Sequence, residues 1–191
     1  MKILQIAPPF LPITEDIKYG GIERVIYILD QELSKRGHES LVAAGKDSRP
    51  IGKLLPTIEK EIGVGFILDK ENDTNTGLNL RLEHLAKSLN YANSDKINPD
   101  VVHVHDDNLL PFIPQIKSPS LLTLHSDYEG GFWNSKIHPD IANSDVNLVA
   151  ISDSQKSIYE KYGYNVKYRV YNGVDMDKFD FEKYKMNFLL S

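Results

Sequence analysis

The 191-residue sequence contains no cysteine, which excludes a fold held together by disulfides. It has no basic excess, because 22 lysines and arginines stand against 27 aspartates and glutamates, and this balance argues against a general nucleic-acid binder. No stretch approaches the roughly 20 apolar residues of a membrane-spanning helix, and the N-terminus lacks the pattern of a secretory signal. We therefore expect a cytoplasmic globular protein.

The residues that are present fit one large domain or slightly more. Apolar residues make up 41% of the chain and charged residues 26%, which is typical of globular proteins, and domains usually contain roughly 100–200 residues. Strands are predicted over residues 2–7 and 39–44. Between them, apolar residues recur at helical spacing from Ile22 to Leu33, and Gly37 ends this helix.

Strands and helices alternate along the rest of the chain. Further strands are predicted over 101–105, 120–125, 146–151 and 166–171. Helices are predicted over 78–89 and 153–162 and near 136–143, and short strands near 56–60 and 64–68 within the loop-rich segment 46–77. Repeated strand–helix–strand units favour an α/β fold, a mainly parallel sheet with helices on both faces.

The carboxyl edge of this sheet is the candidate site. In an open parallel sheet, ligands bind beyond the carboxyl ends of the strands, near the point where the strand order reverses. The segments that follow the predicted strands carry most of the chemically capable side chains: Pro8 to Gly21, His105-Asp106-Asp107, His125-Ser126-Asp127, Ser152-Asp153 and Asn172-Gly173.

Each of these features has a functional and a plain structural interpretation. Gly20-Gly21 precedes a helix, so it either cradles a phosphate at the helix N-terminus or forms an ordinary turn. His103 and His105 share one face of a strand, which is an acceptable spacing for a metal, but a packed core His103 and a rim-facing His105 are favoured. His125 ends its strand before a polar loop and is either a ligand-facing imidazole or a core residue.

Tyrosines alternate with lysines and arginines over residues 159–171. This pattern leaves open a peripheral contact with a membrane surface, although half-buried strand and helix faces explain it more simply. No nucleic-acid partner is expected.

Five segments, taken in order, resemble the N-terminal domain of family 4 (group 1) glycosyltransferases of the GT-B fold. They are Gly20-Gly21-Ile22-Glu23-Arg24 after the Pro-rich loop, Asp100 to His105, Leu122-Thr123-Leu124-His125, Val149-Ala150-Ile151-Ser152, and Tyr171-Asn172-Gly173-Val174-Asp175. The resemblance implies a Rossmann-like, doubly wound sheet that binds the acceptor and faces a second Rossmann-like domain holding a nucleotide sugar.

The resemblance also implies a chemistry. Such enzymes, here of hexosyltransferase type, transfer a sugar with retention of anomeric configuration, and the departing diphosphate takes the acceptor proton. The nucleotide sugar is a substrate, and neither a metal nor another cofactor is expected.

Residue by residue, the resemblance assigns His125 to the transferred sugar near the reaction centre and Gly20 and Gly21 to the donor phosphates. It makes Glu23, His105 and Asp106 acceptor-side neighbours. The residues that it places along the cleft are Ser152, Asn172 and Gly173.

The resemblance covers an acceptor domain over residues 1–175. Residues 176–191 resemble a linker and the start of a donor-binding domain that is missing from the sequence. We therefore expect the chain to be inactive alone. The apolar segment 186–191 is expected to be disordered, or to pair with a second copy in a dimer or a swap.

Two other functions remain open on the sequence. The chain is alternatively a non-catalytic subunit that pairs with a separate donor-domain polypeptide. A flavodoxin-like or nucleotide-binding module of another family is the third interpretation, and it rests on fold analogy alone. The acceptor, the sugar and the nucleotide are not encoded in these motifs.

Overall fold

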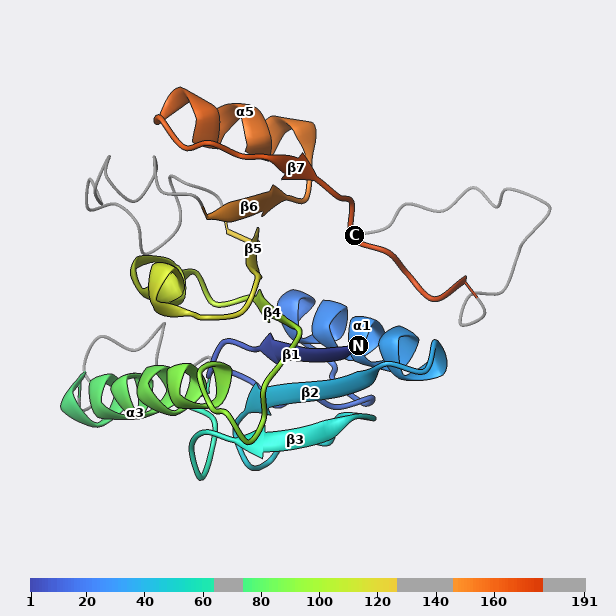
Figure 1. Cartoon of the computed structure of the whole chain (residues 1–191), viewed down its shortest axis with the longest axis vertical. Helices are drawn as coiled ribbons and strands as arrows, with labels where there is room; N and C mark the ends of the chain where they lie inside the picture. Colours follow the sequence, from blue (N-terminus) through green and yellow to red (C-terminus); the bar gives the residue numbers. More distant parts are fainter. Residues whose placement is uncertain (64–73, 127–145, 177–191) are drawn as a thin grey trace, which may run out of the picture.

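The computed structural model describes residues 1–63, 74–126 and 146–176. Its centre is a seven-stranded sheet in which every neighbouring pair is parallel, in the order β3-β2-β1-β4-β5-β6-β7 (Figure 1). The strands are β1 (Lys2–Ile6), β2 (Glu39–Ala44), β3 (Lys53–Pro56), β4 (Val101–Val104), β5 (Ser120–Leu124), β6 (Asn147–Ala150) and β7 (Tyr168–Arg169).

Helices cover both faces of the sheet. In Figure 1, α1 (Gly21–Lys35) lies on one side, while α3 (Thr74–Ala92) and the 3-10 helix η1 (Asp107–Gln115) lie on the other. Helix α5 (Asp153–Lys161) contributes Tyr159 to the same hydrophobic cluster as η1 and α3, so it belongs to their layer. This arrangement confirms the Rossmann-like, doubly wound α/β fold.

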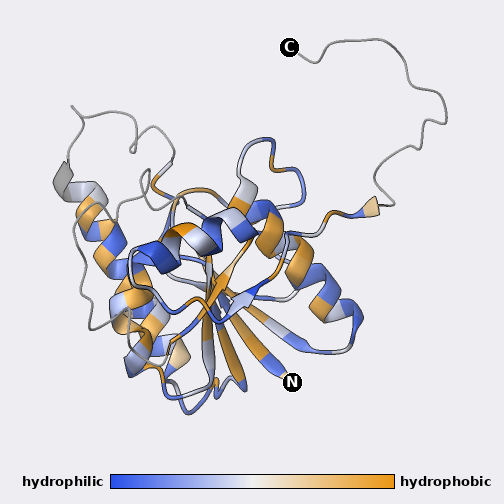
Figure 2. Cartoon of the chain, turned by 90° about the horizontal axis from the view of Figure 1, so that it is seen from above, coloured by the Kyte–Doolittle hydropathy of each residue, from blue (hydrophilic) through white to orange (hydrophobic). Residues whose placement is uncertain are grey.

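The hydrophobic core is divided by the sheet because successive side chains of a strand point to opposite faces. Leu4 and Ile6 of β1 belong to the larger cluster, which faces α3, η1 and α5. Val42 and Ala44 of β2 belong to the smaller cluster, with Ile26 of α1. Figure 2 shows the strands as mainly hydrophobic, as expected for a sheet covered on both faces.

The strand order reverses beside β1. This strand pairs with β2 on one side and with β4 on the other. The chain moves outward from β1 through β2 to β3, then crosses back over the sheet through α3 to β4. The carboxyl ends of β1 and β4 therefore flank the switch point at which doubly wound folds bind ligands.

Most of the predicted elements are confirmed, with three differences. The strand predicted near 56–60 lies instead at 53–56, and the last strand is shorter than 166–171. Helix η1 was not predicted, because it contains Pro111 and Pro114, whose missing N–H groups disrupt the α-helical pattern. The strand near 64–68, the helix near 136–143 and the segment 186–191 lie outside the described residues.

Within the described parts of the chain, no helix combines the length and the apolar character needed to cross a bilayer.

Asp30 links α1 to the turn between β2 and β3. Its side chain is fully buried, and its carboxylate accepts hydrogen bonds from the backbone N–H groups of Ile51 (2.6 Å) and Gly52 (3.1 Å). A Cβ at Gly52 would lie 2.6 Å from this carboxylate and 2.3 Å from the carbonyl oxygen of Ser40, so only glycine fits there. The contact therefore fixes the approach of the turn to the helix.

We predict that Asp30→Ala lowers the free energy of unfolding by about 1–3 kcal/mol, because two partly buried N–H groups lose their acceptor. Urea unfolding measures the change. The matched control on the same helix is Glu32→Ala, whose exposed ion pairs with Lys35 and Arg36 contribute little. Equal unfolding midpoints for the two variants would contradict this account of Asp30.

Candidate active site

A small crevice lies at the switch point of the sheet, with a cavity of about 60 Å³. Its lining comes from the loop after β1, the first turn of α1, the segment after β4 and the turn after β5. The lining residues are Pro8, Phe10, Ile22, His105, Asp106, Asp107, Asn108 and Ser126. Segments that are distant in sequence thus meet where the strand order reverses, as the carboxyl-edge rule predicts.

Gly20 and Gly21 begin α1 beside this crevice. Gly20 has φ +134°, and a Cβ there would lie 2.7 Å from Oε2 of Glu23 and 2.8 Å from Cδ1 of Ile17, so the position requires glycine. Gly21 is exposed, and an added Cβ would meet nothing within 4 Å. The first N–H groups of a 15-residue helix lack partners within the helix, so this end can receive an anion.

Glu23 is buried beneath this turn, with 5% of its surface exposed. Burial raises the pKa of its carboxyl group, and the hydrogen bond to its own backbone opposes the rise. Its side chain packs against Gly20, so it supports the helix start in this structure. Its contact with an acceptor stays a prediction.

Three histidines cluster on the face of the sheet that α1 covers. The ring nitrogens His105 Nδ1 and His125 Nε2 are 3.0 Å apart, and the ring centroids are 5.3 Å apart with an interplanar angle of 27°, so the two rings meet edge to edge. The ring of His103 lies 4.0 Å from that of His105, and its Nε2 is 2.8 Å from the hydroxyl of Thr123. The structure therefore brings together His105 and His125, which the sequence analysis had placed on separate strands.

Burial keeps these histidines neutral. It lowers the pKa of His103 from 6.5 to about 4, and the nearby His125 adds to this effect. It lowers the pKa of His125 to about 4 as well. The pKa of His105 lies well below its usual value, mainly through burial and then through its two histidine neighbours. At pH 7 the cluster consists of neutral imidazoles.

Helix α5 holds the turn that carries His125. The side-chain amide of Gln155 donates to the carbonyl oxygens of Leu124 (3.1 Å) and Ser126 (3.2 Å), on either side of His125. Its Oε1 accepts from the N–H of Ile151 (2.9 Å) at the end of β6, and the Tyr159 hydroxyl also donates to the carbonyl oxygen of Ser126. The ends of β5 and β6 are thereby tied to one helix.

Gln155 carries no functional signal in the sequence. A polar residue in the first turn of a helix is usually exposed to solvent. Only the short connection between β6 and α5 indicates that Gln155 could reach the turn after β5.

Asp106 and Arg81 add charge near the crevice. Asp106 is 4% exposed and caps η1, because its Oδ1 accepts from the N–H of Asn108 (3.0 Å) and from its side-chain amide (2.7 Å). Arg81 of α3 lies over the ring of Phe10 at 4.8 Å from its centroid. Burial lowers the pKa of Arg81, and the carboxylate of Asp106 opposes this. Arg81 was missed because it sits in an ordinary helical pattern far from the other motifs.

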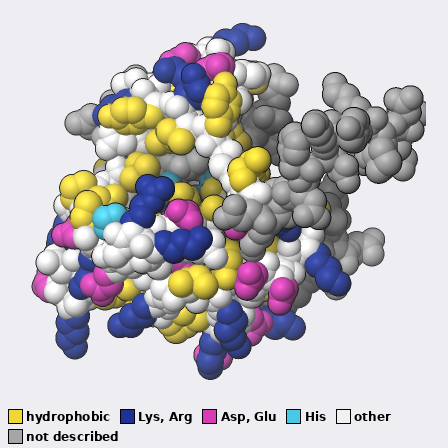
Figure 3. Space-filling view, turned by 90° about the vertical axis from the view of Figure 1, so that its right-hand side faces the viewer, with side chains coloured by type: hydrophobic (Ala, Val, Ile, Leu, Met, Phe, Trp, Pro, Cys, Tyr) yellow, Lys and Arg dark blue, Asp and Glu magenta, His cyan; other side chains and the backbone are white. Residues whose placement is uncertain are grey.

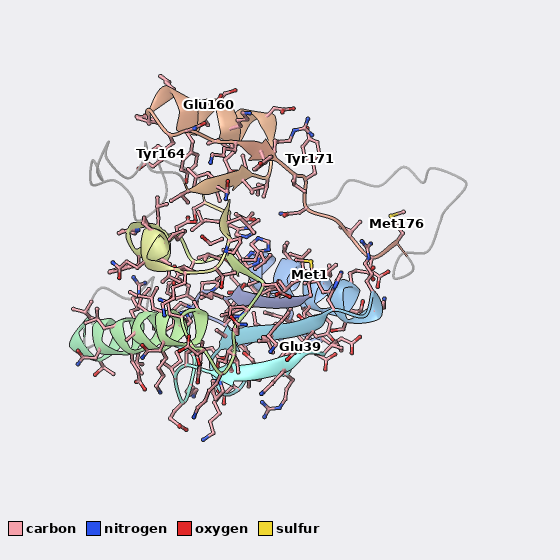
Figure 4. The ribbon with its side chains drawn as sticks, viewed as in Figure 1. Met1, Glu39, Glu160, Tyr164, Tyr171 and Met176 are labelled. Atoms are coloured by element: carbon pink, nitrogen blue, oxygen red, sulfur yellow. The ribbon has the colours of Figure 1, made fainter. Side chains whose placement is uncertain are left out.

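The remaining predicted residues lie away from the small cavity. Ser152 caps α5 and accepts a hydrogen bond from the N–H of Gln155 at 3.1 Å. Asn172 and Gly173 follow β7 and line a larger groove of about 860 Å³ between α1 and residues 167–174, with His103, His105 and Thr123 also in its lining (Figure 3). Figure 4 labels Tyr164, which precedes β7, and Tyr171, which follows it beside this groove.

One ring nitrogen of each of His103 and His105 is used for a contact within the protein. His103 Nε2 pairs with Thr123 and His105 Nδ1 pairs with His125. Among the residues that the structure describes, no group of three or more acidic or histidine side chains converges as a metal site. His103 is half-buried against the ring of His105, and His105, which was expected to face the rim, is buried with 1% of its surface exposed.

The architecture defines a doubly wound α/β domain with a small crevice at its switch point. The sequence profile of Glycosyltransferase Family 4 matches residues 19–178, which span most of the chain and include each segment that forms the crevice from Gly20 onward. The chain therefore belongs to glycosyltransferase family 4.

Comparison with solved structures agrees with this fold. AviGT4, a glycosyltransferase involved in Avilamycin A biosynthesis, is similar with a TM-score of 0.50 and 15% sequence identity. The similarity covers 94% of this chain but 44% of that chain, so this sequence spans less than half the length of the solved relative. No curated protein matches the sequence significantly.

We predict that the pH dependence of stability is weaker in His103→Leu than in the wild type. Between pH 6.5 and 4 the unfolded chain binds a proton at His103 that the folded chain does not, so acidification destabilises the fold by about 1.4 kcal/mol per pH unit for this group. Removal of the histidine removes this contribution. Urea unfolding at pH 7 and pH 5 measures the difference.

The comparison with the wild type is needed because Glu23 and Glu61, whose pKa values are raised mainly by burial, act in the opposite direction. Their contribution is common to both proteins and cancels. The same loss of stability between pH 7 and pH 5 in the two proteins would show that His103 is not held neutral.

Proposed function

We propose that this domain is the acceptor-binding half of a retaining glycosyltransferase that moves a sugar from a nucleotide-sugar donor to an acceptor. The observation that carries the proposal is the meeting of two segments at one crevice. Ile22, next to Gly21, and Ser126, next to His125, line the same cavity. The lining thus includes a neighbour of the helix start proposed for a phosphate and a neighbour of the histidine proposed for a sugar, which supports the proposal in a domain of family 4.

In this proposal the backbone N–H groups at Gly20 and Gly21 lie near the donor diphosphate. Charge that develops on the departing diphosphate is then stabilised by the N-terminus of α1. His125 contacts the transferred sugar, and the diphosphate itself accepts the proton of the attacking hydroxyl. The proposed mechanism uses no metal, and helix N–H groups supply polar contacts on this side of the crevice.

The nucleotide is held, in our proposal, by a second domain that faces the crevice. The solved relative is more than twice as long as its matched part, which supports such an arrangement. Residues 1–175 would then bind the acceptor, and the domain would be inactive without its counterpart. Membership of family 4 removes the support for an unrelated flavodoxin-like module. The cytoplasmic location and a peripheral membrane contact stay predictions.

We predict that His125→Ala, in an enzyme that combines this domain with a donor domain, lowers kcat by about 10²–10³, as for loss of one polar contact to a transition state. Release of nucleoside diphosphate from a panel of UDP-, GDP- and ADP-sugars measures turnover. The matched control is His38→Ala, which changes a histidine between α1 and β2, away from the crevice. A circular dichroism melt checks that both variants fold. Full turnover in His125→Ala would remove His125 from the site.

A pair of glycine substitutions tests the phosphate contact. Gly21→Ala places its methyl group in open space, so we predict an unchanged thermal midpoint but a donor KM raised about tenfold, because the methyl group occupies the approach of the diphosphate. Gly20→Ala is expected to lower the midpoint, since φ +134° and the contact with Glu23 both exclude a Cβ. A wild-type donor KM in Gly21→Ala would argue against phosphate binding at this turn.

A further inference from the structure

His125 directs one of its two ring nitrogens into the protein. Its Nε2 is 3.0 Å from Nδ1 of His105, and the rings are tilted by only 27° from parallel. His105 lies beneath it with 1% of its surface exposed and lines the crevice as well as the larger groove. Within the described residues, Nδ1 is therefore the nitrogen of His125 that remains for a ligand.

The hydrogen bond between these rings has two arrangements. Both imidazoles are neutral at pH 7, because burial lowers the pKa of His125 to about 4 and holds that of His105 well below its ordinary value. A neutral imidazole carries one N–H and one bare nitrogen. Either His105 donates from Nδ1 to Nε2 of His125, or His125 donates from Nε2 to Nδ1 of His105. The choice decides whether Nδ1 of His125, the nitrogen not engaged with His105, carries a proton.

The far side of the His105 ring favours the first arrangement. Nε2 of His105 is fully buried and has no hydrogen-bond partner in the described part of the chain. If His125 were the donor, the proton of His105 would sit on that Nε2 as a buried N–H without an acceptor. Buried N–H groups without acceptors are rarer in proteins than acceptors without donors. His105 therefore keeps its proton on Nδ1, where His125 accepts it.

Neighbouring side chains hold the His105 ring in this orientation. The ring of His103 packs against it, with centroids 4.0 Å apart. His103 is itself held by the hydrogen bond between its Nε2 and the Thr123 hydroxyl at 2.8 Å. Rotation of the His105 ring would have to displace a side chain that is anchored to the next strand.

We propose that His105 is a positioning residue that holds His125 in its Nδ1–H tautomer, so that His125 presents an N–H donor to an oxygen of the ligand. The ligand group recognised is then a hydroxyl, ring or phosphoryl oxygen that accepts a hydrogen bond. His125 cannot act as a base through this nitrogen, which is already protonated. The ligand's identity as a sugar rests on the proposed function, whereas the tautomer does not.

Imidazole ¹⁵N NMR of the full chain at pH 7 tests the tautomer directly, because protonated and bare ring nitrogens have well-separated shifts. The spectra of His125→Gln and His105→Leu assign the two rings by loss of their signals. We expect His125 with a proton on Nδ1 and a bare Nε2, and His105 likewise protonated on Nδ1. A proton on Nε2 of His125 in the wild type would overturn the proposal.

Two substitutions of His105 separate positioning from packing. His105→Asn retains an N–H donor close to the place of Nδ1, so His125 should keep its Nδ1–H form. His105→Leu fills the space without a donor, so His125 should shift toward the Nε2–H form. In the two-domain enzyme, we expect His105→Leu to lower kcat about 10- to 100-fold and His105→Asn to restore most of it. Unchanged tautomer and kcat in His105→Leu would overturn the positioning role.

The two proposals fail in different ways. The expected wild-type tautomer, found in a protein that releases no nucleoside diphosphate from any donor, would support the role of His105 and contradict the proposed transfer reaction. Normal transfer with His125 protonated on Nε2 would do the opposite.

Discussion

The parallel pairing of β1 with β2 on one side and β4 on the other is the constraint on which the rest of the structure depends. Because the chain leaves β1 in one direction and returns to β4 from the other, the loops beyond these two strands diverge. The space between them receives the start of α1, and the residue that follows β4 is His105. The pairing of β1 with β2 and β4 therefore places the N-terminus of α1 and the buried imidazole of His105 at the same crevice.

Burial then determines the chemistry of that crevice. The histidines lose their charge because α1 and the sheet exclude water from their rings, and what remains is a set of neutral dipoles whose directions are held by neighbouring strands. Gln155 also fixes the backbone near the crevice, because its side chain joins the ends of β5 and β6 to α5. Polar groups that cannot reorganise are suited to stabilise charge that develops during a reaction.

Much of the fold could be predicted from the sequence, but less of the candidate site could. The helix from Ile22 and the β-branched run at 101–104 were predicted because their periodicity is local and strong. The edge rule correctly selected His105 and His125 as residues at the carboxyl ends of strands. Their mutual hydrogen bond was not predictable, since it depends on the register between β4 and β5, which pairs His103 with Leu121. Gln155 and Arg81 depend on helix orientation, which periodicity leaves undetermined.

The buried position of His105 changes the chemical roles that a histidine at this edge of the sheet can have. A histidine on a strand end is commonly interpreted as a titrating acid or base, because its ordinary pKa lies near neutrality. Here both imidazoles have lost that property, because a proton gained near pH 7 would place a charge in a buried site. The pair can still differ in which nitrogen carries its single proton. Recognition by this crevice therefore depends on the hydrogen-bond direction that His105 imposes, and it should vary little with pH as long as the fold is intact.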